Sequence, residues 1–151
     1  MSEGFIWDGE QHEMDVAVHR IITEELEAVG GEAVADLTQE WSTGGGMLFT
    51  EVKPRRPGAA RLSVAYQDES TLNVTVGNIW FEIFGKVESN LDHLREIVAA
   101  VFAGRVQEAG FVGNAFGRIY TQSGPIRVGA ITFPWSWKRR ERRQYVPYGN
   151  G

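Results

Sequence analysis

The sequence predicts an α+β fold: an antiparallel sheet of about five to seven strands with two helices packed on one face. Two stretches of the chain place apolar residues at helical spacing, and the stretches between and after them place apolar residues at every second position. The connections between the period-two stretches are short and polar, which favours antiparallel hairpins over parallel crossovers. We expect residues 1–132 to form a single α+β domain and residues 133–151 to form a basic, aromatic C-terminal arm, extended or partly disordered.

The first helix is expected between Gln11 and Val29, where apolar residues recur every three or four positions before a pair of glycines stops the helix. Four strands follow, and a second helix is expected to begin near Ser89 or Asn90, either of which could cap it, and to end before Gly104. Further strands complete the domain. The expected strands cover Met47–Val52, Leu62–Tyr66, Leu72–Val76, Ile79–Ile83, Arg105–Ala109, Phe116–Thr121 and Ile126–Thr132.

The formal net charge of −5 conceals a separation of charge along the chain. Residues 1–51 carry twelve acids and one base, residues 52–117 carry seven of each, and residues 118–151 carry one acid and seven bases. The distribution of charge steers association while saying little about fold. This separation therefore indicates electrostatic recognition of a partner.

Length and composition are those of an ordinary globular domain. A chain of 151 residues that is 42% hydrophobic and 23% charged can bury a core without disulfides or a structural metal. The chain contains no cysteine, which excludes disulfides and thiol chemistry and leads us to expect a cytoplasmic location. It has neither a secretory signal pattern nor an apolar run of about 18 residues, so we expect no membrane span.

No catalytic or cofactor motif stands out, so we expect a protein that is not an enzyme and binds no cofactor. The glycine-rich stretch 43–46 matches neither a dinucleotide fingerprint nor a phosphate-binding loop, and no serine lies in a nucleophile motif. His12, Asp15 and His19 project from one face of the first helix at a spacing that could hold a divalent metal. The alternative is a solvated polar face, and without a fourth ligand we assign no metal site.

The C-terminal arm combines cationic and aromatic side chains, which can neutralise phosphates and stack on unpaired bases. It predicts a nucleic-acid-binding site as one alternative, and contact with the acidic first helix or with a protein as another. The residues of the nucleic-acid alternative are Trp135, Trp137, Lys138, Arg139, Arg140, Arg142 and Arg143.

Two aromatic residues near the centre of the chain are expected on the open face of the sheet. If strand alternation holds, Trp80 and Phe84 point away from Ile79, Phe81 and Ile83 and are exposed. Large apolar groups on an open face often mark a partner surface. The alternative is that the tryptophans of the C-terminal arm cover them.

The stretch from Ile79 to Val106 contains an FEI strand, an LREIV helix and an AGRV exit. It resembles a strand-then-helix passage of small bacterial proteins, some of them similar to immunity proteins of polymorphic toxins. The resemblance covers less than a fifth of the chain and transfers no binding residue. It implies a compact α+β protein that acts by binding.

Our leading hypothesis from the sequence is a non-enzymatic protein-binding protein, of the type of an immunity protein that inhibits a basic toxin. The expected partner-binding residues are Glu13, Glu24, Glu27, Trp80 and Phe84. The alternatives are a nucleic-acid-binding accessory protein that acts through its tail and a small enzyme or metal-binding protein. An exposed sheet edge also leaves a homodimer open.

Overall fold

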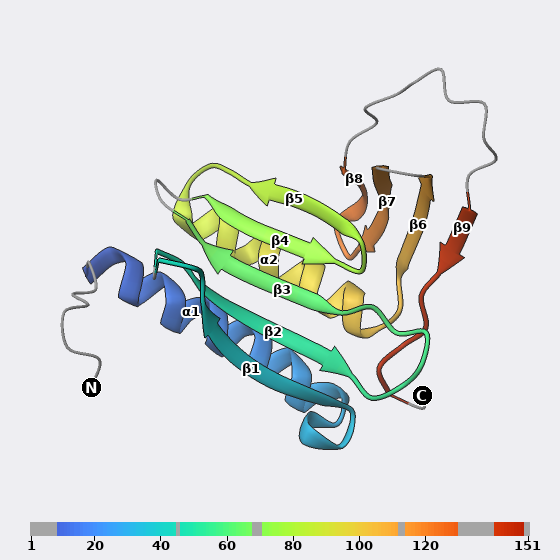
Figure 1. Ribbon diagram of the computed structural model, residues 1–151, viewed down its shortest axis with the longest axis horizontal. Helices are drawn as coiled ribbons and strands as arrows, with labels where there is room; N and C mark the ends of the chain where they lie inside the picture. Colours follow the sequence, from blue (N-terminus) through green and yellow to red (C-terminus); the bar gives the residue numbers. More distant parts are fainter. Residues whose placement is uncertain (1–8, 45, 68–70, 112–113, 130–140, 150–151) are drawn as a thin grey trace.

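The computed structural model describes residues 9–44, 46–67, 71–111, 114–129 and 141–149. In this part of the chain, two α-helices and nine strands form two antiparallel sheets of five and four strands (Figure 1). The helices are α1 (Gly9–Val29) and α2 (Val87–Phe102), and both lie behind the larger sheet in Figure 1. The predicted α+β class, with two helices on one face of an antiparallel sheet, is confirmed.

The larger sheet is a meander in which each strand pairs with the next one along the chain. Its register pairs apolar residues of neighbouring strands, for example Val52 with Leu62 and Val74 with Phe81. Every second residue faces the helices, as expected for strands that are buried on one side. The strands are β1 (Ala35–Trp41), β2 (Leu48–Pro54), β3 (Leu62–Tyr66), β4 (Leu72–Val76) and β5 (Ile79–Ile83).

The smaller sheet has the strand order β8-β7-β6-β9 and contains the C-terminal part of the chain. Its strands are β6 (Val106–Phe111), β7 (Asn114–Thr121), β8 (Gly124–Gly129) and β9 (Glu141–Gln144). The sequence predicted one sheet, and the strands instead divide into two because β5 and β8 are edges that do not pair with each other. Strand periodicity reports which side of a strand is buried, and it does not report which strands pair.

The core lies between the helices and the larger sheet and continues under the smaller sheet. Ile22 of α1 and Leu94 and Val98 of α2 are fully buried in it. In the smaller sheet, Val106 and Ile119 are also fully buried and belong to the same core. One continuous hydrophobic core therefore holds both sheets.

Several element bounds shift by one to three residues from the sequence prediction, and two differences have a physical reason. β1 was not predicted, because six of its seven residues are only partly buried or exposed and it lacks apolar alternation; it forms by pairing with β2 along its whole length. α2 begins at Val87, before the predicted caps, and its N-cap Lys86 makes no side-chain cap hydrogen bond. Asn90 is instead buried within the helix, and its Nδ2 donates to the carbonyl of Gly85 at 3.4 Å.

The described C-terminal residues 141–149 are part of the fold. β9 pairs with β6, and the chain then places Tyr145 and Tyr148 in the core. The Tyr148 ring packs against Phe102 with 4.6 Å between ring centroids, and its hydroxyl donates to the carbonyl of Ala60. Arg56, in the loop after β2, donates to the carbonyl of Gly149 at 3.0 Å. These contacts attach the end of the chain to the β2–β3 connection.

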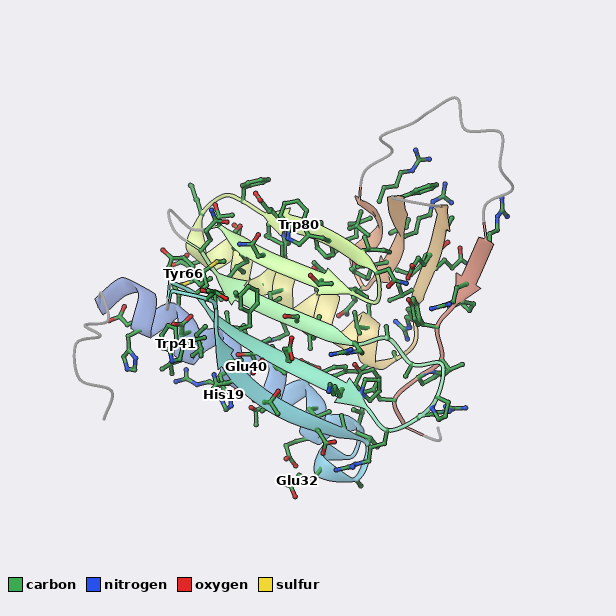
Figure 2. All side chains as sticks on the ribbon, viewed as in Figure 1. His19, Glu32, Glu40, Trp41, Tyr66 and Trp80 are labelled. Carbon is green, nitrogen blue, oxygen red and sulfur yellow. The ribbon has the colours of Figure 1, made fainter. Side chains whose placement is uncertain are left out.

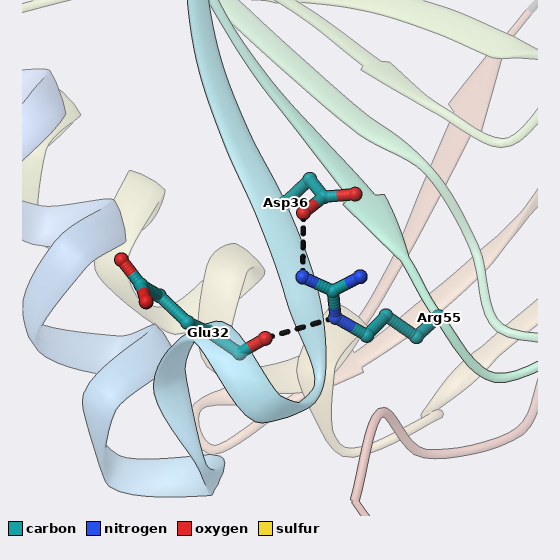
Figure 3. A network of polar contacts seen from close by, with 3 residues as sticks. All are labelled: Glu32, Asp36 and Arg55. Atoms are coloured by element: carbon teal, nitrogen blue, oxygen red, sulfur yellow. Dashed lines mark hydrogen bonds and ion pairs between the residues drawn. The ribbon is translucent and has the colours of Figure 1, made fainter.

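The turn from α1 to β1 is closed by a short 3-10 helix and a polar network (Figure 3). Arg55 Nε donates to the carbonyl of Glu32 at 2.9 Å, and Arg55 Nη2 contacts Asp36 Oδ1 at 2.6 Å. Both side chains of this ion pair are about half exposed, so its contribution to stability is at most about 1 kcal/mol.

Neither described helix is long and apolar enough to cross a membrane.

Candidate functional site

The face of the larger sheet opposite the helices is turned toward the viewer in Figures 1 and 2 and carries acidic and aromatic side chains. Val52, Val64 and Val74 are fully buried and mark the covered face. Because successive side chains of a strand point to opposite faces, their neighbours in sequence belong to the open face. We call it the acidic face; its charged and aromatic members are Asp36, Glu40, Phe49, Glu51, Lys53, Trp80 and Glu82.

The strand register arranges the acidic face in cross-strand rows. Glu40 and Phe49 begin a row that ends at Glu82 on β5, and Glu51 lies in the adjacent row that ends at Trp80. Neighbouring strands are about 4.8 Å apart, so a row from β1 to β5 spans about 19 Å. Figure 2 shows Glu40 and Trp80 at the two sides of this surface. The acidic face is therefore wide enough for a protein partner.

Trp80 and Phe84 are exposed, as the strand alternation predicted. The exposed fraction is 56% for Trp80 and 68% for Phe84, the two highest values among the large hydrophobic residues described. Trp80 lies on the acidic face, two residues before Glu82 on the same side of β5. The predicted alternative cover, Trp135 and Trp137, lies outside the described residues.

A groove of about 470 Å³ separates the edge of β5 from the edge of β8, with α2 as its floor. Phe84 lines this groove together with Phe81 and Ile83 from one wall and Ile126 from the other. A turn residue of the β7–β8 hairpin closes one part of it, because the Ser123 hydroxyl donates to Glu96 Oε1 at 2.6 Å on α2. The groove is open to an apolar side chain of a partner protein, which would lie beside the exposed Phe84.

The glutamates predicted for partner binding lie on another surface. Glu13, Glu24 and Glu27 are exposed on α1, which packs on the covered side of the sheet. Glu24 Oε2 is 3.0 Å from Arg95 Nη1 of α2, so it already takes part in an ion pair between the helices. The structure thus does not bring these three glutamates together with Trp80.

The three metal candidates of α1 have different environments. His12 is exposed and His19 is half-buried, whereas Asp15 is only 5% exposed, which corrects the expectation of a solvated polar face. Burial raises the pKa of the Asp15 carboxyl to about 6, although the nearby His12 lowers it. No group of three potential metal ligands was found in the described part of the chain.

The predicted nucleic-acid-binding tail is described only at Arg142 and Arg143. The other five residues, Trp135, Trp137, Lys138, Arg139 and Arg140, lie outside the described residues. Both arginines belong to β9, away from the N-terminal part of α1 (Figure 1), so this part of the tail does not fold onto that helix. Arg142 and Arg143 are successive residues of a strand and point to opposite faces of the smaller sheet.

Arg143 points toward a polar cluster at the end of the acidic face. Its guanidinium lies 5.8 Å from the centre of the Tyr145 ring, and both residues line a second groove, of about 410 Å³, that reaches Glu51. The Tyr145 hydroxyl donates to the buried carboxylate of Glu108, whose other oxygen accepts from Asn78 Nδ2 at 2.9 Å. Burial, together with the contact with Glu108, raises the pKa of Tyr145 to about 12, although Arg143 lowers it. This cluster joins β6 and β9 to the β4–β5 turn.

Sequence reasoning missed Glu40, Glu51 and Glu82 as members of a candidate site. Each is an acid on a strand, and an even number of positions separates it from another outward residue of the same strand, so the two share a face. That alternation is visible in the sequence, but which strands lie side by side is not. Comparison with protein-family models, with curated proteins and with solved structures finds no match to this chain.

Proposed function

We propose that this protein is a non-enzymatic protein-binding protein that takes up a basic partner protein on the acidic face. Four carboxylates lie on this surface. Asp36 is paired with Arg55, and Glu51 shares a groove with Arg61 and Arg143, so the attraction for a positively charged partner comes mainly from Glu40 and Glu82. The resemblance to immunity proteins suggests the kind of partner, a basic toxin that would be occluded without chemistry. The protein would then act as an inhibitor.

The observation that carries this proposal is the exposed Trp80 on the same side of β5 as Glu82. Tryptophan is among the residues that most often supply the binding energy of an interface, and surrounding charges set the encounter rate and the choice of partner. Phe84 continues the exposed aromatic surface to the groove beside β8. The exposed side of α1 presents carboxylates but, among its described residues, no exposed aromatic ring.

The test is affinity capture from nuclease-treated lysate of the source cells, with identification by mass spectrometry. We expect one basic protein to be retained by the intact chain and by the control variant Trp41→Ala. Trp41 is 39% exposed and lies on β1, at the opposite edge of the larger sheet, so its removal takes away an exposed aromatic ring far from Trp80 and Phe84. The double variant Trp80→Ala/Phe84→Ser should reduce retention at least about tenfold, since two such side chains contribute more than 1.4 kcal/mol together.

Charge reversal separates the two acidic surfaces. Glu40→Lys/Glu82→Lys should abolish capture, whereas Glu13→Lys/Glu24→Lys/Glu27→Lys should leave most of it, because those glutamates lie on α1. Loss of capture in the α1 variant alone would move the partner site to the helix. A partner retained by every variant would contradict the proposal.

A further inference from the structure

The smaller sheet has a face of the opposite charge. Val106, Ile119 and Val128 are buried and mark the side that faces the core. The residues between them point outward, and no acidic side chain is found among the described positions of that side. We call it the basic face; its members with long or aromatic side chains are Arg105, Gln107, Phe116, Arg118, Tyr120, Arg127, Arg142 and Gln144.

Two arginines of the basic face are directly opposite each other. The register pairs Arg118 of β7 with Arg127 of β8, and both side chains are exposed. Like charges at directly opposite positions of a sheet destabilise it. Neither Arg118 nor Arg127 takes part in the ion pairs of the described residues that join Arg55 to Asp36 and Arg95 to Glu24 and Glu25. An anion placed between the two guanidinium groups would remove their repulsion.

Aromatic rings lie on both sides of this arginine pair. Phe116, Arg118 and Tyr120 occupy alternate positions of β7, an inner strand of the sheet, so they share one face at intervals of about 7 Å. The Tyr120 hydroxyl donates to Gln107 Oε1 at 3.0 Å, a contact that orients the ring from the neighbouring strand. The central strand therefore presents a ring, a guanidinium group and a second ring in line.

We propose that the basic face binds single-stranded nucleic acid. Phosphates would lie against Arg118 and Arg127, and unpaired bases would stack on the neighbouring rings, which is how sequence-tolerant single-strand sites work. An acidic protein surface would form ion pairs with the arginines but would offer no planar bases to stack on the two rings. Bases inside a duplex are already stacked on each other, so a double strand would gain only the phosphate contacts.

This inference does not depend on the C-terminal arm. Arg118, Arg127 and Tyr120 belong to β7 and β8, and only Arg142 and Gln144 of the basic face come from the predicted arm. The segment 130–140, which contains Lys138, joins β8 to β9, the two edges of the same sheet. The site is also separate from the acidic face, which belongs to the other sheet, so binding of nucleic acid and binding of a basic protein can be tested independently.

The test is fluorescence anisotropy of a labelled dT12 oligonucleotide and of the corresponding 12-base-pair duplex, titrated with the intact chain at several salt concentrations. We expect tighter binding of dT12 than of the duplex. Arg118→Gln/Arg127→Gln should weaken dT12 binding at least about tenfold at low salt and should reduce the salt slope by about 1.4, or about 0.7 per phosphate contact. Tyr120→Leu should weaken binding about fivefold or more, while Tyr120→Phe should retain it, because the ring stacks and the hydroxyl does not.

The control variant is Arg20→Gln/Arg61→Gln, which removes the same charge from exposed positions on α1 and near β3. Equal loss in this control would show non-specific attraction and overturn the proposal. Loss in Lys138→Gln/Arg139→Gln/Arg140→Gln together with unchanged binding in Arg118→Gln/Arg127→Gln would place the site in the arm and also overturn it. Binding of polyglutamate as tight as that of dT12 and insensitive to Tyr120→Leu would show that the face recognises charge only, which contradicts a nucleic-acid site. Thermal unfolding of each variant confirms that it is folded.

Discussion

Replacing Asp15 with asparagine is expected to stabilise the protein at neutral and alkaline pH. Asp15 is a nearly fully buried carboxyl on α1, and its Oδ2 has no hydrogen-bond partner among the described residues. A charged group in such a position loses its hydration without compensation, and burial therefore raises the pKa of this carboxyl from 3.8 to about 6. Asparagine has nearly the same shape and carries no charge.

The magnitude follows from the difference between the two pKa values. The carboxyl of Asp15 binds its proton more tightly in the folded state than in the unfolded state. Proton binding therefore stabilises the fold fully below pH 3.8, and this stabilisation is lost as pH rises through 6. A difference of about two pH units corresponds to about 3 kcal/mol. The pKa of about 6 already includes the opposing effect of the nearby His12. Asp15→Asn should thus gain up to about 3 kcal/mol at pH 8 and little at pH 4.

Urea unfolding of the two proteins at pH 4, 5, 6, 7 and 8 measures this gain directly. The difference in unfolding free energy should rise between pH 4 and pH 7 and then stay constant. Glu13→Gln, which removes one charge from an exposed position on the same helix, controls for the change in net charge. A difference that does not change with pH, or a loss of stability at pH 8, would refute the assignment of Asp15 as a buried, unsatisfied carboxylate.

Two further predictions concern the contact between the sheets. Gly77 has φ +60°, and a Cβ atom there would collide with the Tyr145 hydroxyl, so Gly77→Ala should lower the unfolding free energy by more than about 2 kcal/mol in urea. Burial and then the Glu108 contact raise the pKa of Tyr145 to about 12. Native stability should therefore fall as pH rises from 10 to 12, and Tyr145→Phe should reduce this fall, as unfolding at pH 9 and 11 would show.

Much of the secondary structure could be predicted because it depends on residues close in sequence. The helical spacing of Val18, Ile22 and Leu26 and the alternation of Leu72, Val74 and Val76 identify α1 and β4 without any knowledge of their neighbours. β1 and β9 have no such pattern, since most of their residues are exposed, and they exist because β2 and β6 offer edges to pair with.

The candidate sites were only partly predictable for the same reason. Alternation along β5 was sufficient to place Trp80 on the open face, and it could not show that α1, with Glu24, lies on the other side of the sheet. The basic run of the tail looked continuous in sequence. The strand conformation of β9 separates Arg142 from Arg143, and the pairing of β7 with β8 instead joins Arg118 to Arg127.

The sequence by itself determined the α+β class, the type and approximate place of most elements, and the separation of acidic from basic residues along the chain. Only the tertiary structure decided that there are two sheets, that Asp15 is buried, that Glu40 and Glu82 share a face of one sheet, and that Arg118 and Arg127 share a face of the other. The physical reason is that the spacing of apolar residues along the chain depends on which side chains face the core and which face water. The composition of a surface depends on which strands share hydrogen bonds, and those partners are distant in sequence.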